Sequence, residues 1–292
     1  MASFGATSFQ NLSIKEDASA PRIDVGAAHA HLDAIDAALE HTAPLVDADG
    51  DASWGPVVVA PHISLAEAVI VGQELLHRWV FEPFIENPTV GRLLASSKHT
   101  FVHDHSRRVA MTTIDYQLRD MTRFQLDDVQ LATGRRLCRV QQATDSLTPL
   151  GLVVGGDVLD AGDGQPYPTF VLEIFYKNES LSDLRATLAR WMDGTSVQVA
   201  FGIKVNTRGH RYVLVLHVRG QPVVESRIDH HATPIRWAGF PVAALYWGVA
   251  LPPALAGYAE AMVNVDIYLL RESLYGPNSA ATGAGFGYIG FS

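Results

Sequence analysis

The stretch PYPTFVLEIFYKNES, residues 166–180, places one carboxylate inside an otherwise apolar run. The residues on both sides of Glu173 are typical of a buried strand. Successive side chains of a strand point to opposite faces, so Glu173 shares a face with Val171, Phe175 and Lys177. Burying a carboxylate is costly unless it is paired, protonated or bound to a metal. Glu173 therefore needs either solvent or a partner.

Further acidic residues precede this strand in the sequence GGDVLDAGDG. A hairpin between the two segments would bring Asp157, Asp160 or Asp163 beside Glu173. Two close carboxylates repel each other unless a cation lies between them, and carboxylate oxygens suit Mg²⁺ or Mn²⁺. Lys177 would then orient an attacking water or stabilise developing negative charge. The alternative is a Glu173 on a solvated face, paired with Lys177.

A longer stretch that contains Glu173 reads QPYPTFVLEIFYKNESLSDLRATLARWMDGTSVQVAFGIKV. It resembles a fungal and oomycete family of restriction-endonuclease-like proteins, which is similar to the PD-(D/E)XK nuclease superfamily and its Uma2-like branch. The family pattern is a Pro-Thr-x-x-x-Glu strand, a capped Leu-Arg helix with a Trp, and a VQVxxGIKI strand. The matching positions are Pro168, Thr169, Glu173, Glu179, Ser180, Leu184, Arg185, Trp191 and 197–205.

The resemblance implies an α/β fold with a PD-(D/E)XK restriction-endonuclease-like core, a mixed β-sheet flanked by helices. It also implies a metal-dependent nuclease that hydrolyses phosphodiester bonds in DNA or RNA. Asp157 and Glu173 would hold Mg²⁺ or Mn²⁺, and Lys177 would assist. Asp160 is the alternative first ligand, and Glu74 of an earlier helix is a further candidate acid.

The sequence departs from the superfamily pattern at the lysine. The usual Glu-x-Lys element would place it at position 175, which is Phe175 here, and Lys177 lies two residues further on. Such a change is expected either in an enzyme whose lysine has moved or in a protein that has lost catalysis. The alternative function is therefore an inactive restriction-endonuclease-like fold used for binding or self-assembly.

Composition narrows the class of protein. The chain has 292 residues, 48% of them hydrophobic, which is typical of a globular protein. The formal net charge of −9 disfavours a broad basic surface that would coat nucleic acid without specificity. Cys138 is the single cysteine, so no intrachain disulfide forms. With no evident signal peptide or membrane-length apolar run, we expect an intracellular protein, cytoplasmic or nuclear, without a membrane partner.

The chain is predicted to form one domain between two tails. Residues 1–21 are small and polar and predict a flexible N-terminal tail. Residues 276–292 combine glycines with spaced aromatic residues and predict a C-terminal tail. A single restriction-endonuclease-like α/β domain with an N-terminal helical part is expected over 22–275. Homo-oligomers would form through the tails.

Within the domain, periodicity predicts helices first. Leu32, Ile35 and Leu39 recur at helical spacing. Ser64 and Glu67 form a capping-box pattern at the start of LAEAVIVGQELLHRWVFEPFI, and VGRLLASS indicates another helical piece.

Strands are predicted to follow. KHTFVHDH and RRVAMTTIDYQL contain β-branched residues and indicate strands, on which His103 and His105 would share a face. Those histidines could hold a metal, but surface histidines are commoner. TFVLEIFY, VQVAFGIKV and RYVLVLHVRG also predict strands. SLSDLRATLARWM predicts a helix capped by Ser180, with Leu184 and Leu188 on its apolar face.

Overall fold

The computed structural model describes the greater part of the domain. Described are residues 26–27, 30, 32–34, 45–46, 52–53, 57–74, 77–87, 89–98, 101–123, 130–133, 137–138, 141–162, 164–176, 179–206, 211–228 and 238–265. Both predicted tails lie outside these residues. No helix in the described part of the chain is long and apolar enough to cross a membrane.

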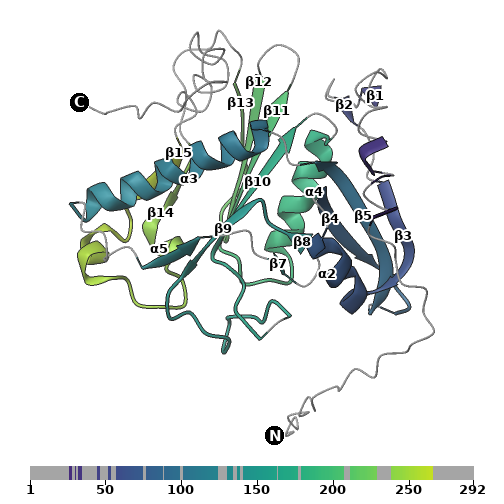
Figure 1. Ribbon diagram of the computed structural model, residues 1–292. Coiled ribbons are helices and arrows are strands. Elements are labelled where there is room, and N and C mark those ends of the chain that lie inside the picture. The colour runs from purple at the N-terminus through teal and green to yellow at the C-terminus, as the bar shows by residue number, and fades with distance from the viewer. Residues whose placement is uncertain are drawn as a thin grey trace, which may run out of the picture.

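A six-stranded mixed sheet forms the centre of the fold (Figure 1), in the order β13-β12-β11-β10-β9-β6. Strands β10 and β11 are parallel, and the other neighbouring strands are antiparallel. The strands are β6 (Leu131–Thr133), β9 (Asp145–Pro149), β10 (Phe170–Tyr176), β11 (Val199–Asn206), β12 (Arg211–Val218) and β13 (Val224–Ile228).

Two helices cover opposite faces of this sheet. Helix α3 (Phe101–Met121) buries Ala110, Ile114 and Leu118 against the face of β10 that carries Leu172. Helix α4 (Leu181–Met192) packs on the other face. Both faces of β10 are therefore buried, which explains its almost continuous apolar sequence. A solvated face for Glu173 is excluded by this arrangement.

A second sheet of five strands lies beside the first, in the order β3-β5-β4-β8-β7. Its own apolar cluster includes Ala68 of α2 and Trp79. The strands and helix are β3 (Val57–Ser64), α2 (Leu65–Glu74), β4 (His77–Pro83), β5 (Val90–Lys98), β7 (Leu137–Cys138) and β8 (Gln141–Gln142). Three residues after β8 the chain enters the large sheet as β9.

Short elements complete the description. They are β1 (Leu45–Val46), β2 (Ala52–Ser53), β14 (Ala238–Pro241), α5 (Val242–Leu245), the 3₁₀-helix η2 (Pro253–Tyr258) and β15 (Met262–Val265). Phe240 of β14 contacts Phe170 of β10, with ring centroids 5.4 Å apart. Elements β14, α5, η2 and β15 therefore add to the core on the α3 side of the sheet.

The predicted α/β class is confirmed, with a mixed and an antiparallel sheet flanked by helices. The predicted strands at KHTFVHDH and RRVAMTTIDYQL are wrong, because this segment is the helix α3. Ala110, Ile114 and Leu118 recur every four residues and are buried, whereas the β-branched residues between them are more exposed. His103 and His105 therefore do not share a strand face.

The predicted N-terminal helical part is only partly correct. The capping box at Ser64 forms, with the Glu67 backbone N–H donating to Ser64 Oγ over 3.2 Å and the Ser64 N–H donating to Glu67 Oε2 over 3.1 Å. The helix ends at Glu74, and the remainder of the predicted helix contains β4. The separate helical piece predicted at VGRLLASS is strand β5. Strand β5 pairs with both β3 and β4, so tertiary pairing overrides local helical preference.

Candidate functional site

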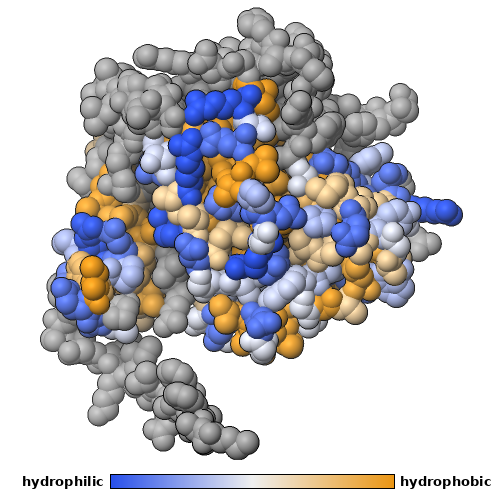
Figure 2. Space-filling model, turned by 180° about the vertical axis from the view of Figure 1, so that it is seen from behind, coloured by the Kyte–Doolittle hydropathy of each residue, from blue (hydrophilic) through white to orange (hydrophobic). Residues whose placement is uncertain are grey.

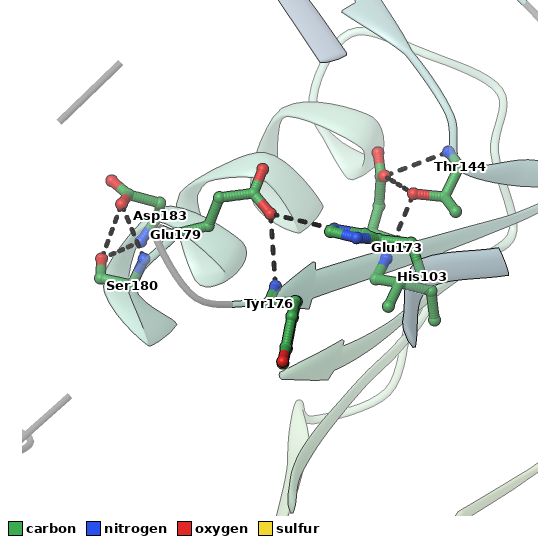
Figure 3. A network of polar contacts seen from close by, with 8 residues as sticks. His103, Thr144, Glu173, Tyr176, Glu179, Ser180 and Asp183 are labelled. Carbon is green, nitrogen blue, oxygen red and sulfur yellow. Dashed lines mark hydrogen bonds and ion pairs between the residues drawn. The ribbon is translucent and has the colours of Figure 1, made fainter. Parts of the chain in front are cut away.

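Glu173 lies in the interior, with a relative exposure of 0%. Its Oε1 accepts a hydrogen bond from Trp191 Nε1 over 2.5 Å. Its Oε2 accepts from the Thr144 backbone N–H over 3.2 Å and from Thr144 Oγ1 over 3.1 Å (Figure 3). Protein donors thus reach both oxygens of the carboxyl group, and they satisfy much of what burial requires.

Helix α4 positions Trp191 for this contact. Ser180 and Asp183 form a capping box that begins the helix, with Ser180 Oγ accepting from the Asp183 backbone N–H over 3.0 Å. Leu184 and Leu188 share the buried face with Trp191, at helical spacing. The predicted helix, cap and apolar face are confirmed. The indole N–H is thereby directed at β10.

A second polar contact joins α3 to the segment that precedes α4. His103 Nε2 lies 3.5 Å from Glu179 Oε2, and both side chains are only 4% exposed. The same Glu179 oxygen accepts the backbone N–H of Tyr176 over 3.4 Å, and Figure 3 shows it between the two groups. The His103 ring also meets the Tyr176 ring edge-on, with centroids 6.0 Å apart. The contacts of Glu179 with His103 and with Tyr176 therefore lie at the carboxyl end of β10.

Asp145 is a buried acid that the sequence analysis did not single out. Its Oδ2 accepts from Arg107 Nη1 of α3 over 2.8 Å, and its side chain is 2% exposed. Asp145 is the antiparallel partner of Leu172, so its side chain lies on the α3 face. Glu173 points to the α4 face. The two buried carboxyl groups are therefore on opposite faces of the sheet.

The predicted pair of Asp157 and Glu173 is not formed. Asp157 is exposed in a turn closed by hydrogen bonds between Gly155 and Val158. Next to this turn, Leu159 accepts the backbone N–H of Tyr167, ahead of the amino-terminal end of β10. Strand β10 begins at Phe170, and Glu173 lies three residues further along it, roughly 10 Å at about 3.3 Å per residue.

Two further predicted acids, Asp160 and Glu74, do not add a ligand to Glu173 either. Asp160 is exposed, and its Oδ1 caps its own loop by accepting from the N–H groups of Gly162 and Gly164 at 2.7 and 3.0 Å. Glu74 is exposed at the end of α2. Asp163 and Lys177 lie outside the described residues.

Lys204 is a functional candidate that sequence reasoning missed. It is 1% exposed and lies on β11 as the parallel partner of Phe175. Parallel partners point to the same face, so Lys204 and Glu173 both lie on the α4 face. The signal was present in the sequence: Lys204 interrupts VQVAFGIKV as Glu173 interrupts TFVLEIFY.

The described residues do not fit a Mg²⁺ or Mn²⁺ site at Glu173. Across the described ranges, no group of three or more histidine, cysteine, aspartate or glutamate residues could hold a metal ion. Both oxygens of Glu173 already accept hydrogen bonds, from Trp191 and from Thr144. Hard cations prefer several oxygen ligands, and indole N–H groups supply none.

Comparison with known proteins does not assign this chain to a family. No family model matches this chain, and no curated protein is similar to it in sequence. The function is therefore argued from the contacts of the site itself.

His105 gives the stability of the protein a predicted pH dependence. Burial, and then the charge of Arg108, lower the pKa of His105 below its ordinary value of 6.5. The unfolded chain therefore takes up a proton at a higher pH than the folded protein does. The stability that the protein gains from a neutral His105 is complete above pH 6.5. It is lost as the pH falls through the pKa of His105 in the folded protein.

We expect His105→Gln to reduce the loss of stability below pH 6.5. The measurement is denaturant unfolding of both proteins over a series of pH values. His62→Gln, at an exposed position on β3, is the control. Parallel pH profiles for wild type and His105→Gln would contradict the assignment.

Proposed function

We propose that this chain is a non-catalytic binding domain with a restriction-endonuclease-like core, in which Glu173 has a structural role. The order of strands in the large sheet supports this restriction-endonuclease-like core. Strands β6, β9 and β10 are neighbours in the sheet and pair antiparallel. Strand β11 follows α4 in the chain and pairs with β10 in parallel. Helices α3 and α4 flank it on opposite faces. This arrangement agrees with the mixed, helix-flanked sheet that the sequence resemblance implies.

The observation that carries the proposal is the environment of Glu173. In the resembling nucleases this position would hold a metal, so its oxygens would have to be available in an open site. Here the side chain is completely buried, and Trp191 and Thr144 donate to both oxygens. Glu173 therefore joins β10 to α4 and to the start of β9. A buried acceptor of this kind specifies packing, and protein donors already engage both of its oxygens.

The second candidate is the metal-dependent nuclease acting on DNA or RNA with Mg²⁺ or Mn²⁺. One observation favours it: Lys204 places a buried amine on the same face as Glu173, where such enzymes use a lysine. In this candidate Lys204 or Lys177 would replace the lysine absent at Phe175.

Cleavage assays separate the two candidates. Wild type and Glu173→Gln would each be incubated with single- and double-stranded DNA and RNA and Mn²⁺, at low salt because the acidic chain would bind nucleic acid weakly. We expect no substrate to be cleaved faster by wild type than by the variant. Cleavage that requires the metal and falls by orders of magnitude in a folded Glu173→Gln protein would establish the nuclease instead.

A further inference from the structure

Strand β13 forms one outer edge of the large sheet. It pairs with β12 from Tyr212↔Ile228 to Leu216↔Val224 without a register shift. Among the strands that the structure describes, none pairs with the other side of β13. Alternate backbone N–H and C=O groups of an edge strand point outward and can pair with another strand.

This edge lacks two common protections against pairing. Strand β3, an edge of the smaller sheet, contains Pro61 and two register shifts, both of which disrupt an incoming strand. Strand β6, the opposite edge of the large sheet, has only three residues. Strand β13 has five residues, Val-Glu-Ser-Arg-Ile, with neither proline nor bulge. Of these three edges, β13 is the one best suited to accept a partner.

The sequence of β13 is complementary to itself. An antiparallel pair centred on Ser226 places Glu225 opposite Arg227 of a second copy, and the two-fold symmetry repeats this contact. Val224 then faces Ile228 of the other copy. A parallel pair in register would instead place Glu225 beside Glu225 and Arg227 beside Arg227. The charges therefore favour one orientation, and that orientation closes as a symmetric dimer.

Both charged side chains are placed for such contacts. They point to the α4 face, and Glu225 accepts from Arg185 Nε and Nη2, each over 3.0 Å. Arg227 Nε lies 3.5 Å from Glu225 Oε1, and the Arg227 side chain is 54% exposed. Arg185 thus holds Glu225 at the edge, and the exposed Arg227 is within reach of a neighbouring chain.

The surrounding surface indicates how a partner would be held. Val223 and Val224 are exposed by 54% and 49%. Figure 2, which views the molecule from behind, shows hydrophilic and hydrophobic side chains of the described residues intermixed on that face. Association at this edge would consequently depend on backbone pairing and matched charges more than on burial of a large apolar area.

We propose that two copies of this chain associate through antiparallel pairing of their β13 strands, which joins their large sheets into one. The proposal goes beyond the binding function proposed above and does not depend on it. It also differs from oligomerisation through the terminal tails, because the contact lies in the ordered sheet.

Charge exchange at β13 tests the proposal on the full chain. Wild type, Arg227→Glu and Glu225→Arg would be compared by sedimentation over a concentration series. Wild type should reach the mass of two chains, and each variant alone should stay at the mass of one. Mixing the two variants should restore the two-chain species, because the two acidic side chains of one variant's β13 then face the two basic side chains of the other's. Circular dichroism would confirm that both variants fold.

Arg92→Glu is the matched control, since Arg92 is an exposed arginine on β5 that pairs with Glu82, and this variant should dimerise as wild type does. A wild type that stays monomeric would overturn the proposal. A strand of another protein would then be the alternative partner for β13. A dimer that persists in Arg227→Glu would also overturn it. Failure of the mixed variants to associate would exclude the register centred on Ser226.

Discussion

Truncating Trp191 to alanine is expected to lower the free energy of unfolding by at least about 3 to 5 kcal/mol, the usual range for a buried tryptophan. Trp191 is 1% exposed and packs in the cluster between α4 and the large sheet. Its removal would leave a cavity and also deprive Glu173 Oε1 of its indole donor. Denaturant unfolding followed by circular dichroism measures the loss without relying on the deleted fluorophore.

Trp191→Phe separates the hydrogen bond from the packing. Phenylalanine retains an aromatic ring but has no N–H, so Glu173 Oε1 would lose its donor. The cost of Trp191→Phe should be larger by about 1 to 3 kcal/mol in the wild type than in a Glu173→Leu background, where no acceptor remains. If Trp191→Phe lowered stability equally in both backgrounds, the hydrogen bond between Trp191 and Glu173 would contribute nothing to stability.

Leu188→Ala is expected to lower the free energy of unfolding by about 2 to 5 kcal/mol, as buried leucine truncations do. Leu188 is fully buried on α4 and lies over β11 where Gly202 leaves room for it. A methyl group added at Gly202 would come within 2.6 Å of Leu188 Cδ1, so the leucine side chain would have to shift to make room for it. Urea or guanidinium unfolding at neutral pH provides the measurement.

Leu150→Ala is the matched control for Leu188→Ala. Leu150 is 59% exposed, so the same truncation should change stability by no more than about 0.5 kcal/mol. A loss of that small size for Leu188→Ala would mean that α4 does not pack on the sheet as described.

The elements around Glu173 were predictable because local pattern and tertiary role agree there. Ser180, Asp183 and the leucines of α4 combine a cap with helical periodicity, and β10 is apolar because both of its faces are buried. The opposite holds for α3. Its exposed face carries Thr112 and other residues that favour strands, and the buried every-fourth-residue pattern is interrupted by polar positions.

From the sequence, the site could be predicted only as one charged residue inside an apolar strand. Glu173 was singled out as a carboxyl group that needs either solvent or a partner, but its donors come from positions 29 residues earlier and 18 residues later in the chain. Spacing along one strand cannot reveal such contacts. The sequence resemblance selected Asp157 among the acids that a hairpin offered, and the fold places Asp157 in an exposed turn. Asp145, which pairs with Arg107 inside the protein, was overlooked.

The structural role of Glu173 is tested most directly by denaturant unfolding of wild type and Glu173→Gln, each with and without Mn²⁺. Glutamine presents an amide NH₂ where one acceptor oxygen was, opposite a donor from Trp191 or Thr144. We expect the variant to be less stable by about 1 to 3 kcal/mol, with Mn²⁺ changing neither protein. Stabilisation of wild type by Mn²⁺ that disappears in Glu173→Gln would contradict this account, because it would show that Glu173 binds the metal.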